Sequence, residues 1–190
     1  MNIIWHGHSC FEITGKDGTI VFDPYQANSV PGLNSLKLKA NLVLCSHEHD
    51  DHNARNCVEV APKDFKVTFI ETYHDHHQGS HRGKNTIHIV DFEDLKVVHM
   101  GDIGCMMDDI SKLKNCDVLM IPIGGYYTID TKEALKYIER IQPRIVIPMH
   151  YCSHEFGYDV LSTNEEFIQK SSNIVYVDDY LEVHKETKGQ

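Results

Sequence analysis

The sequence predicts a single α/β domain in which two β-sheets are covered by helices on their outer faces. Two observations lead to this prediction. Short runs typical of strands follow one another through the first half of the chain, and in the second half such runs alternate with amphipathic helical segments. No linker or low-complexity tract divides the sequence, so residues 1–190 are expected to form one domain.

The expected strands are short apolar runs bounded by turn residues. Lys16-Asp17-Gly18 predicts a hairpin turn between the second and third strands. A continuous apolar run at residues 42–45 is typical of a buried strand. In chain order, strands are expected at residues 3–5, 10–14, 19–22, 42–45, 66–70, 86–90, 95–99, 118–121, 144–147, 174–177 and 181–184.

Three helices are expected in the second half of the chain. Asp130, with Glu133 three residues later, predicts a capping box that opens a helix. Apolar residues at helical spacing follow, and Pro143 marks the end of this helix. Residues 162–165 predict a second capping box and helix, and residues 106–113 a shorter helix whose methionines pack in the core.

Composition excludes several classes of protein. Lys plus Arg is 18 and Asp plus Glu is 28, which gives a net charge of −10, and such a chain repels a long nucleic acid. Its longest apolar runs, of four residues, are too short for the roughly 20 residues of a membrane helix. Six cysteines are too few for a disulfide scaffold, and the first residues do not resemble a signal peptide. These features predict a cytoplasmic protein with reduced thiols.

The 14 histidines are clustered, which is the first indication of metal chemistry. Residues 46–52 read Ser-His-Glu-His-Asp-Asp-His and directly follow an expected strand. Imidazole and carboxylate groups are good ligands for zinc-like ions. His47 and His49 are two residues apart and point the same way if strand geometry persists, whereas Asp51 and His52 diverge. One short segment could therefore serve two neighbouring ions.

Three distant residues, His74, Asp102 and His150, each follow another expected strand. Strands that end at one edge of the sheets would gather these residues with those of the first segment. Four agreeing segments favour a metal site over a solvated loop or a histidine-rich storage tract. The segment around His74 also contains three further histidines, and the choice of His74 depends on its position nearest the strand end. The alternative ligands or substrate contacts in this segment are His76, His77 and His81.

These motifs resemble those of the metallo-β-lactamase fold. Residues 47–52 match its HxHxDH signature, and the other motif positions are matched in order by Asp23, His74, Asp102 and His150. Residues 7–11, 101–102, 122–125 and 148–151 are similar to the small hydrolases related to ascorbate-6-phosphate lactonase. The resemblance implies a four-layer αββα sandwich with helices outside both sheets.

The same resemblance implies a dinuclear metal site. The first ion would be held by His47, His49 and His74, and the second by Asp51, His52 and His150. Asp102 would bridge the two ions. Zinc is the expected metal, although manganese, iron and nickel suit the same ligands. Asp23 is expected to bond a ligand loop, or to be a turn residue before Pro24. The resemblance places His8 at the mouth of the site, with a core histidine as the alternative.

The expected reaction is hydrolysis of a small lactone or ester-like substrate. Two ions about 3.5–4 Å apart can share a water and lower its pKa to about 7, and Asp51 would orient the resulting hydroxide. The alternatives are a metal-dependent phosphodiesterase or nuclease, and a metal-binding protein without catalysis. Arg82 and Lys84 lie on the loop that bears His74, and these two cations predict a local site for an anionic group of the substrate; a solvated loop tip is the alternative.

Overall fold

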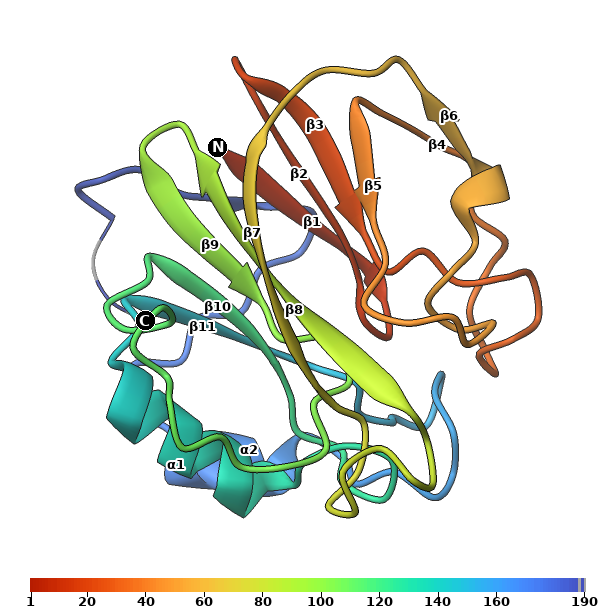
Figure 1. Ribbon diagram of the computed structural model, residues 1–190, viewed down its shortest axis with the longest axis vertical. Helices are drawn as coiled ribbons and strands as arrows, with labels where there is room; N and C mark the ends of the chain where they lie inside the picture. Colours follow the sequence, from red (N-terminus) through yellow and green to blue (C-terminus); the bar gives the residue numbers. More distant parts are fainter. Residues whose placement is uncertain (188, 190) are drawn as a thin grey trace.

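The structure is a computed structural model that describes residues 1–187 and 189. Two five-stranded sheets face each other (Figure 1). The first sheet consists, in spatial order, of β12 (Leu181–Glu182), β1 (Asn2–Gly7), β2 (Cys10–Gly15), β3 (Gly18–Phe22) and β5 (Leu42–Leu44). The second sheet consists of β11 (Ile145–Met149), β10 (Val118–Pro122), β9 (Leu95–His99), β8 (Lys84–Phe92) and β7 (Lys66–Tyr73).

The main core lies between these two sheets. Alternate residues of each strand point into it, as the two-residue period of a strand requires. Phe11, Ile13 and Phe22 enter from the first sheet, and Val97 and Met120 enter from the second. The hairpin predicted between the second and third strands is confirmed, with Gly15 paired to Gly18 across the turn.

The outer face of the second sheet is covered by α1 (Thr131–Ile141) and α2 (Glu165–Lys170), which lie away from the first sheet in Figure 1. Ile89, Val98 and Leu119 pack there against Tyr137 of α1 and Phe167 of α2. These strand residues alternate with those of the main core, so β8, β9 and β10 are buried on both faces, whereas the edge strand β7 is largely exposed.

Helix α1 begins at the expected capping box. The Glu133 backbone N–H donates to Asp130 Oδ1 at 2.9 Å, and the Asp130 N–H donates to Glu133 Oε2 at 3.2 Å. The helix ends before Gln142, which adopts a left-handed conformation with φ 54° immediately before Pro143.

The outer face of the first sheet has a different cover. Cys10 and Val21 pack against Tyr25 and Val30 of the loop after β3 and against a small sheet. This sheet pairs β4 (Leu38–Ala40) with β6 (Val58–Val60), two strands that are too short to be recognised in the sequence. Within the described ranges, the helical structure on this side is the single 3₁₀ turn η1 (Arg55–Cys57). Among the described residues, helices therefore cover one sheet, and the helical layer expected outside the other sheet in a four-layer αββα sandwich is replaced by a loop and short strands.

The helix expected at residues 106–113 is wrong, and the segment forms bends and turns. Its backbone N–H and C=O groups form hydrogen bonds with side chains of α1 instead of with each other, as they would in a helix. Tyr137 Oη accepts from the Met107 N–H at 2.8 Å and donates to the Cys105 carbonyl at 2.9 Å. The Arg140 guanidinium donates to the Met107 carbonyl at 2.8 Å. A sequence pattern cannot show such competition for the backbone groups.

Two further expectations differ from the structure. Helix α2 begins at Glu165, but its N-cap Asn164 makes no side-chain capping bond, so the capping box predicted at residues 162–165 is wrong. Residues 174–177 form no strand, and all four are exposed. Among residues 1–187 and 189, no helix has the length and apolar character needed to cross a bilayer.

Candidate metal centre

Both sheets bring the ends of their strands to one edge of the molecule. Strands β1, β3 and β5 run in the same direction, as do β7, β9, β10 and β11. The residues that follow these strands include all seven predicted metal ligands. They are His47, His49, Asp51 and His52 after β5, His74 after β7, Asp102 after β9 and His150 after β11.

Three residues at this edge turn sharply as soon as their strand ends. His8, Asp23 and His150 directly follow β1, β3 and β11, and have φ values of 53°, 42° and 53°. A positive φ is uncommon for residues with a side chain, although Asp, Asn and His adopt it more readily than most. This conformation redirects each side chain from the sheet toward the space between the strand ends, and such strain is typical of functional sites.

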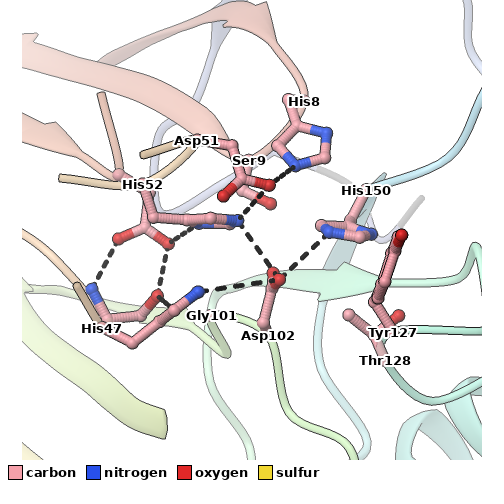
Figure 2. Close-up of polar contacts among 12 residues, drawn as sticks. His8, Ser9, His47, Asp51, His52, Gly101, Asp102, Tyr127, Thr128 and His150 are labelled. Atoms are coloured by element: carbon pink, nitrogen blue, oxygen red, sulfur yellow. Dashed lines mark hydrogen bonds and ion pairs between the residues drawn. The ribbon is translucent and has the colours of Figure 1, made fainter. Parts of the chain in front are cut away.

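Asp102 lies at the centre of the group (Figure 2). Its Oδ2 atom is 3.0 Å from His150 Nε2 and 3.2 Å from His52 Nε2. The Nε2 atoms of His74 and His47 are 3.3 Å and 4.0 Å from the same oxygen. Asn85 fixes the position of Asp102, because its Oδ1 accepts from the Asp102 backbone N–H at 2.8 Å. Four imidazoles thus converge on one buried carboxylate.

Asp23 orients two of these imidazoles from behind. Its Oδ2 accepts from His52 Nδ1 at 2.8 Å and from Ser46 Oγ at 2.6 Å. Because Ser46 Oγ uses its proton on Asp23, the Nδ1 atom of His47, 2.9 Å away, is assigned as the donor to that hydroxyl. The supporting role expected for Asp23 agrees with these contacts.

His74 is oriented in the same way, since its Nδ1 donates to the Tyr127 carbonyl at 3.0 Å. With their Nδ1 protons engaged, His47, His52 and His74 each direct Nε2 toward Asp102. Such hydrogen bonds to the far nitrogen are what metal-binding histidines require.

These residues fit a divalent metal ion. The Nε2 atoms of His47 and His52 and the Oδ1 atom of Asp102 are buried without a hydrogen-bond partner. An imidazole lone pair that faces a carboxylate oxygen is repulsive unless a cation lies between them. Histidine and aspartate are also the donors that zinc-like ions prefer.

The buried charges shift several pKa values. Burial alone would lower the pKa of His52, but the carboxylates of Asp102 and Asp23 raise it well above its usual value. Burial, and then repulsion by His52, lowers the pKa of His47 to about 3. Burial would raise the pKa of Asp102, yet His150 and His52 hold it well below its usual range. Without metal, a proton on His52 therefore supplies the cation, and a metal ion would displace it.

Ligand atoms form three overlapping groups, each with atoms within 4.8 Å of one another. The groups are His47 with His49 and His74, His47 with His52 and Asp102, and His8 with Asp51, His52 and His150. The structure also separates the four histidines of the third segment. His74 is buried within the first group, whereas the other three are exposed: His76, His77 and His81.

His8 lies deeper in the site than the family resemblance implied. It is fully buried rather than at the mouth of the site, and its Nε2 atom lies 3.2 Å from Asp51 Oδ2. Burial lowers the pKa of His8 to about 4, so the ring is neutral at pH 7 and its Nε2–H donates to Asp51.

Sequence reasoning missed Tyr158. Its hydroxyl is 3.3 Å from Asp51 Oδ2 and 2.7 Å from the Ser29 carbonyl, and its one proton is shared between these acceptors. Tyr158 is 107 residues from Asp51 along the chain, and no motif surrounds it.

The two predicted anion-binding residues lie in different surroundings. Lys84 is exposed and its Nζ pairs with Glu71 Oε2 at 3.1 Å. Arg82 is half-buried and its guanidinium covers the rings of Tyr126 and Tyr127. Tyr127, whose ring Arg82 contacts, lies beside the metal group in Figure 2, and its carbonyl accepts from His74 Nδ1.

Comparison with known proteins gives the family. A family model described as a beta-lactamase superfamily domain matches residues 2–150. A UPF0173 metal-dependent hydrolase of Thermoplasma acidophilum is 30% identical over 189 residues, and the match covers 80% of this chain and 83% of the relative. A relative of the same description from Staphylothermus marinus is 31% identical over 192 residues, with 76% and 81% covered.

Solved structures agree with this assignment. A Thermotoga maritima protein of the metallo-beta-lactamase superfamily superposes with a TM-score of 0.77 at 25% identity, covering 100% of this chain and 94% of the other. A metallo hydrolase of Ignicoccus hospitalis shares the fold, with a TM-score of 0.64 at 20% identity and 89% of both chains covered. The chain therefore has the metallo-beta-lactamase fold and belongs to the UPF0173 family of metal-dependent hydrolases.

Proposed function

We propose that this metal-dependent hydrolase uses two divalent ions, with zinc as the metal, to cleave a small lactone or ester-like substrate. The observation that carries the proposal is the convergence of four imidazoles on the single buried carboxylate of Asp102. A storage tract needs no such arrangement, whereas catalysis needs ligands held by a rigid shell.

Two ions are proposed because the group that contains Asp102 shares His47 with one further ligand group and His52 with the other. His47, His49 and His74 would hold one ion, and Asp51, His52 and His150 would hold the other. Asp102 has two oxygens, of which Oδ1 is buried and unpartnered, so it is suited to bridge both. Manganese, iron and nickel suit these donors as well, and the metal present would depend on availability.

When bound, such ions supply a nucleophile from water at neutral pH and polarise the substrate oxygen. The protein's contribution is to orient the groups around them. His8 fixes Oδ2 of Asp51, so this carboxylate can accept a proton or hydrogen bond from the attacking water in one orientation. Asp51 remains ionised at neutral pH because its hydrogen bond from His8 and the charge of His52 outweigh burial and lower its pKa.

A small carbonyl substrate is favoured over a nucleic acid. The chain carries a net charge of −10, which disfavours a long polyanion. The motifs similar to ascorbate-6-phosphate lactonase, at residues 7–11 and 148–151, support a lactone or ester. The cytoplasm is the proposed location, since all six cysteines lie within the described residues and are free thiols.

A substrate panel tests the proposal. Wild-type protein loaded with zinc is assayed on a lactone, an aryl ester, a thioester and bis(4-nitrophenyl) phosphate, beside Asp102→Asn and the exposed control His154→Ala. We expect turnover of the lactone or ester that Asp102→Asn abolishes and His154→Ala retains. Turnover of the phosphodiester alone would instead assign the protein to the phosphodiesterases. Bound zinc without turnover of any compound would make it a metal-binding protein.

A further inference from the structure

We propose that Arg82 and Tyr127 form a binding site for an oxyanion, a carboxylate or phosphate that the substrate carries away from its scissile bond. The inference rests on the proposed function, because it adds a substrate class to the hydrolase site. Four observations carry it: a guanidinium with free donors, its contact with a tyrosine that bonds a proposed metal ligand, a rigid supporting loop, and a nearby lysine that is already paired.

The first observation concerns the partners of the arginines. Arg55 pairs with Glu48 at 2.7 Å, and Arg144 pairs with Asp117 at 3.1 Å. The Arg140 guanidinium donates to two carbonyls of the 106–108 segment. Across residues 1–187 and 189, by contrast, the Arg82 guanidinium has neither a carboxylate within 4.0 Å nor a hydrogen-bond acceptor. Its five N–H donors are therefore available to a ligand.

The second observation is the position of this guanidinium. Arg82 Cζ lies 5.2 Å from the centre of the Tyr127 ring and 5.8 Å from that of Tyr126. Contact with these two rings restrains the guanidinium, and its N–H groups remain free to bind an oxyanion.

Tyr127 connects this guanidinium to the metal ligands. Its carbonyl accepts from His74 Nδ1 at 3.0 Å, and its ring centre lies 6.0 Å from that of Tyr158. The Tyr158 hydroxyl is in turn 3.3 Å from Asp51 Oδ2. Arg82 is thus linked to the proposed ligand Asp51 through the rings of Tyr127 and Tyr158, and to His74 through the Tyr127 carbonyl. A small substrate could contact the centre with its carbonyl group and Arg82 with its anionic group.

The third observation is that the loop bearing Arg82 is rigid. Asp75 is buried and its carboxylate accepts four backbone N–H groups of this loop, including that of Arg82 at 2.8 Å. The other three donors, at 2.7–3.1 Å, are His77, Gly79 and His81. A guanidinium presented on a fixed loop loses less entropy when it binds a ligand.

The fourth observation separates Arg82 from Lys84. Lys84 begins β8 opposite Tyr73, and its ammonium group is exposed and paired with Glu71. Because Lys84 is exposed and already paired with Glu71, we do not include it in the anion-binding site. The sequence led us to expect that Arg82 and Lys84 bind the anion together, but the proposed site contains Arg82 alone. Lys84, two residues away, serves as a matched control.

The test compares two esters of equal length, 4-nitrophenyl butyrate and mono-4-nitrophenyl succinate, which differ by a terminal methyl against a carboxylate. The readout is the ratio of kcat/KM for the anionic ester to that for the neutral ester. We expect Arg82→Ala to lower this ratio about tenfold through KM, because a charge-assisted hydrogen bond is lost. Arg82→Lys should retain part of the ratio, and Lys84→Ala all of it. An unchanged ratio in Arg82→Ala, or an equal fall in Lys84→Ala, would overturn the inference.

A second measurement separates this inference from the proposed function. Metal-free protein is titrated with succinate, and with inorganic phosphate in a parallel arm, while the ring signals of Tyr126 and Tyr127 are followed by nuclear magnetic resonance. We expect shifts that saturate in wild type and in Lys84→Ala but vanish in Arg82→Ala, even if no ester is hydrolysed. Whichever anion binds more tightly identifies the preferred group. Tyrosine signals that do not respond to either anion would refute the site, whatever the outcome of the hydrolysis panel.

Discussion

The Nε2 atom of His8 donates to Oδ2 of Asp51 across 3.2 Å, although the two residues are 43 positions apart in the sequence. His8 can reach Asp51 because it leaves β1 with a φ of 53°, which turns its ring into the space between the strand ends. One strand of the first sheet therefore fixes the orientation of a proposed metal ligand in another segment. His8 is accordingly a positioning residue.

Replacing His8 tests this role. His8→Ala removes the N–H donor and leaves Asp51 free to rotate, so we expect zinc affinity to fall about 10–100-fold, as for other residues that orient metal ligands. His8→Gln, whose amide can still donate, should recover part of the loss. Zinc affinity is measured by competition with a chelator, and kcat in the same preparations. If His8→Ala binds zinc as tightly as wild type, the contact does not orient a ligand.

Asp23 offers a similar test from the other side of the centre. Its two oxygens accept three hydrogen bonds, from Ser46 N–H, Ser46 Oγ and His52 Nδ1. In Asp23→Asn one carboxylate oxygen is replaced by an NH₂ group, which is a donor and so cannot accept from the N–H and O–H groups around it. The hydrogen bond that holds the proton on His52 Nδ1 is then lost or weakened, and the tautomer of His52 is no longer fixed. We expect zinc affinity to fall about 10–100-fold, with circular dichroism unchanged. An Asn variant with wild-type affinity would show that the tautomer of His52 is not set by Asp23.

Asp102→Asn probes the number of metal ions. An amide keeps the volume of the carboxylate but lacks its charge, so it bridges two cations poorly. We expect wild-type protein to approach two zinc ions per chain by elemental analysis, and Asp102→Asn to approach one, with severe loss of turnover. A reproducible single ion in wild type after zinc supplementation would contradict a dinuclear centre.

Much of this arrangement could be predicted from the sequence because it depends on local patterns. Apolar runs gave the principal strands, and the polar residues His74, Asp102 and His150 stood out because each follows such a run. The capping box of α1 is equally local, since Asp130 and Glu133 bond to each other within one turn.

What could not be predicted depends on distant contacts or backbone conformation. Tyr158 reaches Asp51 from 107 residues away. The depth of His8 follows from a left-handed φ that no neighbouring residue specifies. The segment at 106–113 fails to form a helix because Tyr137 and Arg140 bind its backbone groups. Each case is a tertiary interaction that overrides a local preference.

His88 provides a test of pH dependence that does not involve the proposed ligands. It is buried on β8, 2% exposed, near the rings of Phe22 and Phe69. Burial lowers its pKa from 6.5 to about 4, so the folded protein keeps His88 neutral at a pH where the unfolded chain protonates it. Between these values the unfolded state binds more protons, and stability therefore falls as the pH falls from about 6.5 to about 4.

The size of the effect follows from the shift. The lowering of the His88 pKa from 6.5 in the unfolded chain to about 4 in the folded protein corresponds to about 3 kcal/mol of unfolding free energy. We expect metal-free His88→Leu to lose less stability than wild type between pH 7 and pH 4.5, by about 2–3 kcal/mol, as measured by urea unfolding. His154→Gln serves as the control, because the side chain of His154 is 90% exposed. If wild type and His88→Leu lose equal stability over this range, His88 already takes up its proton in the folded state, and burial does not keep it neutral.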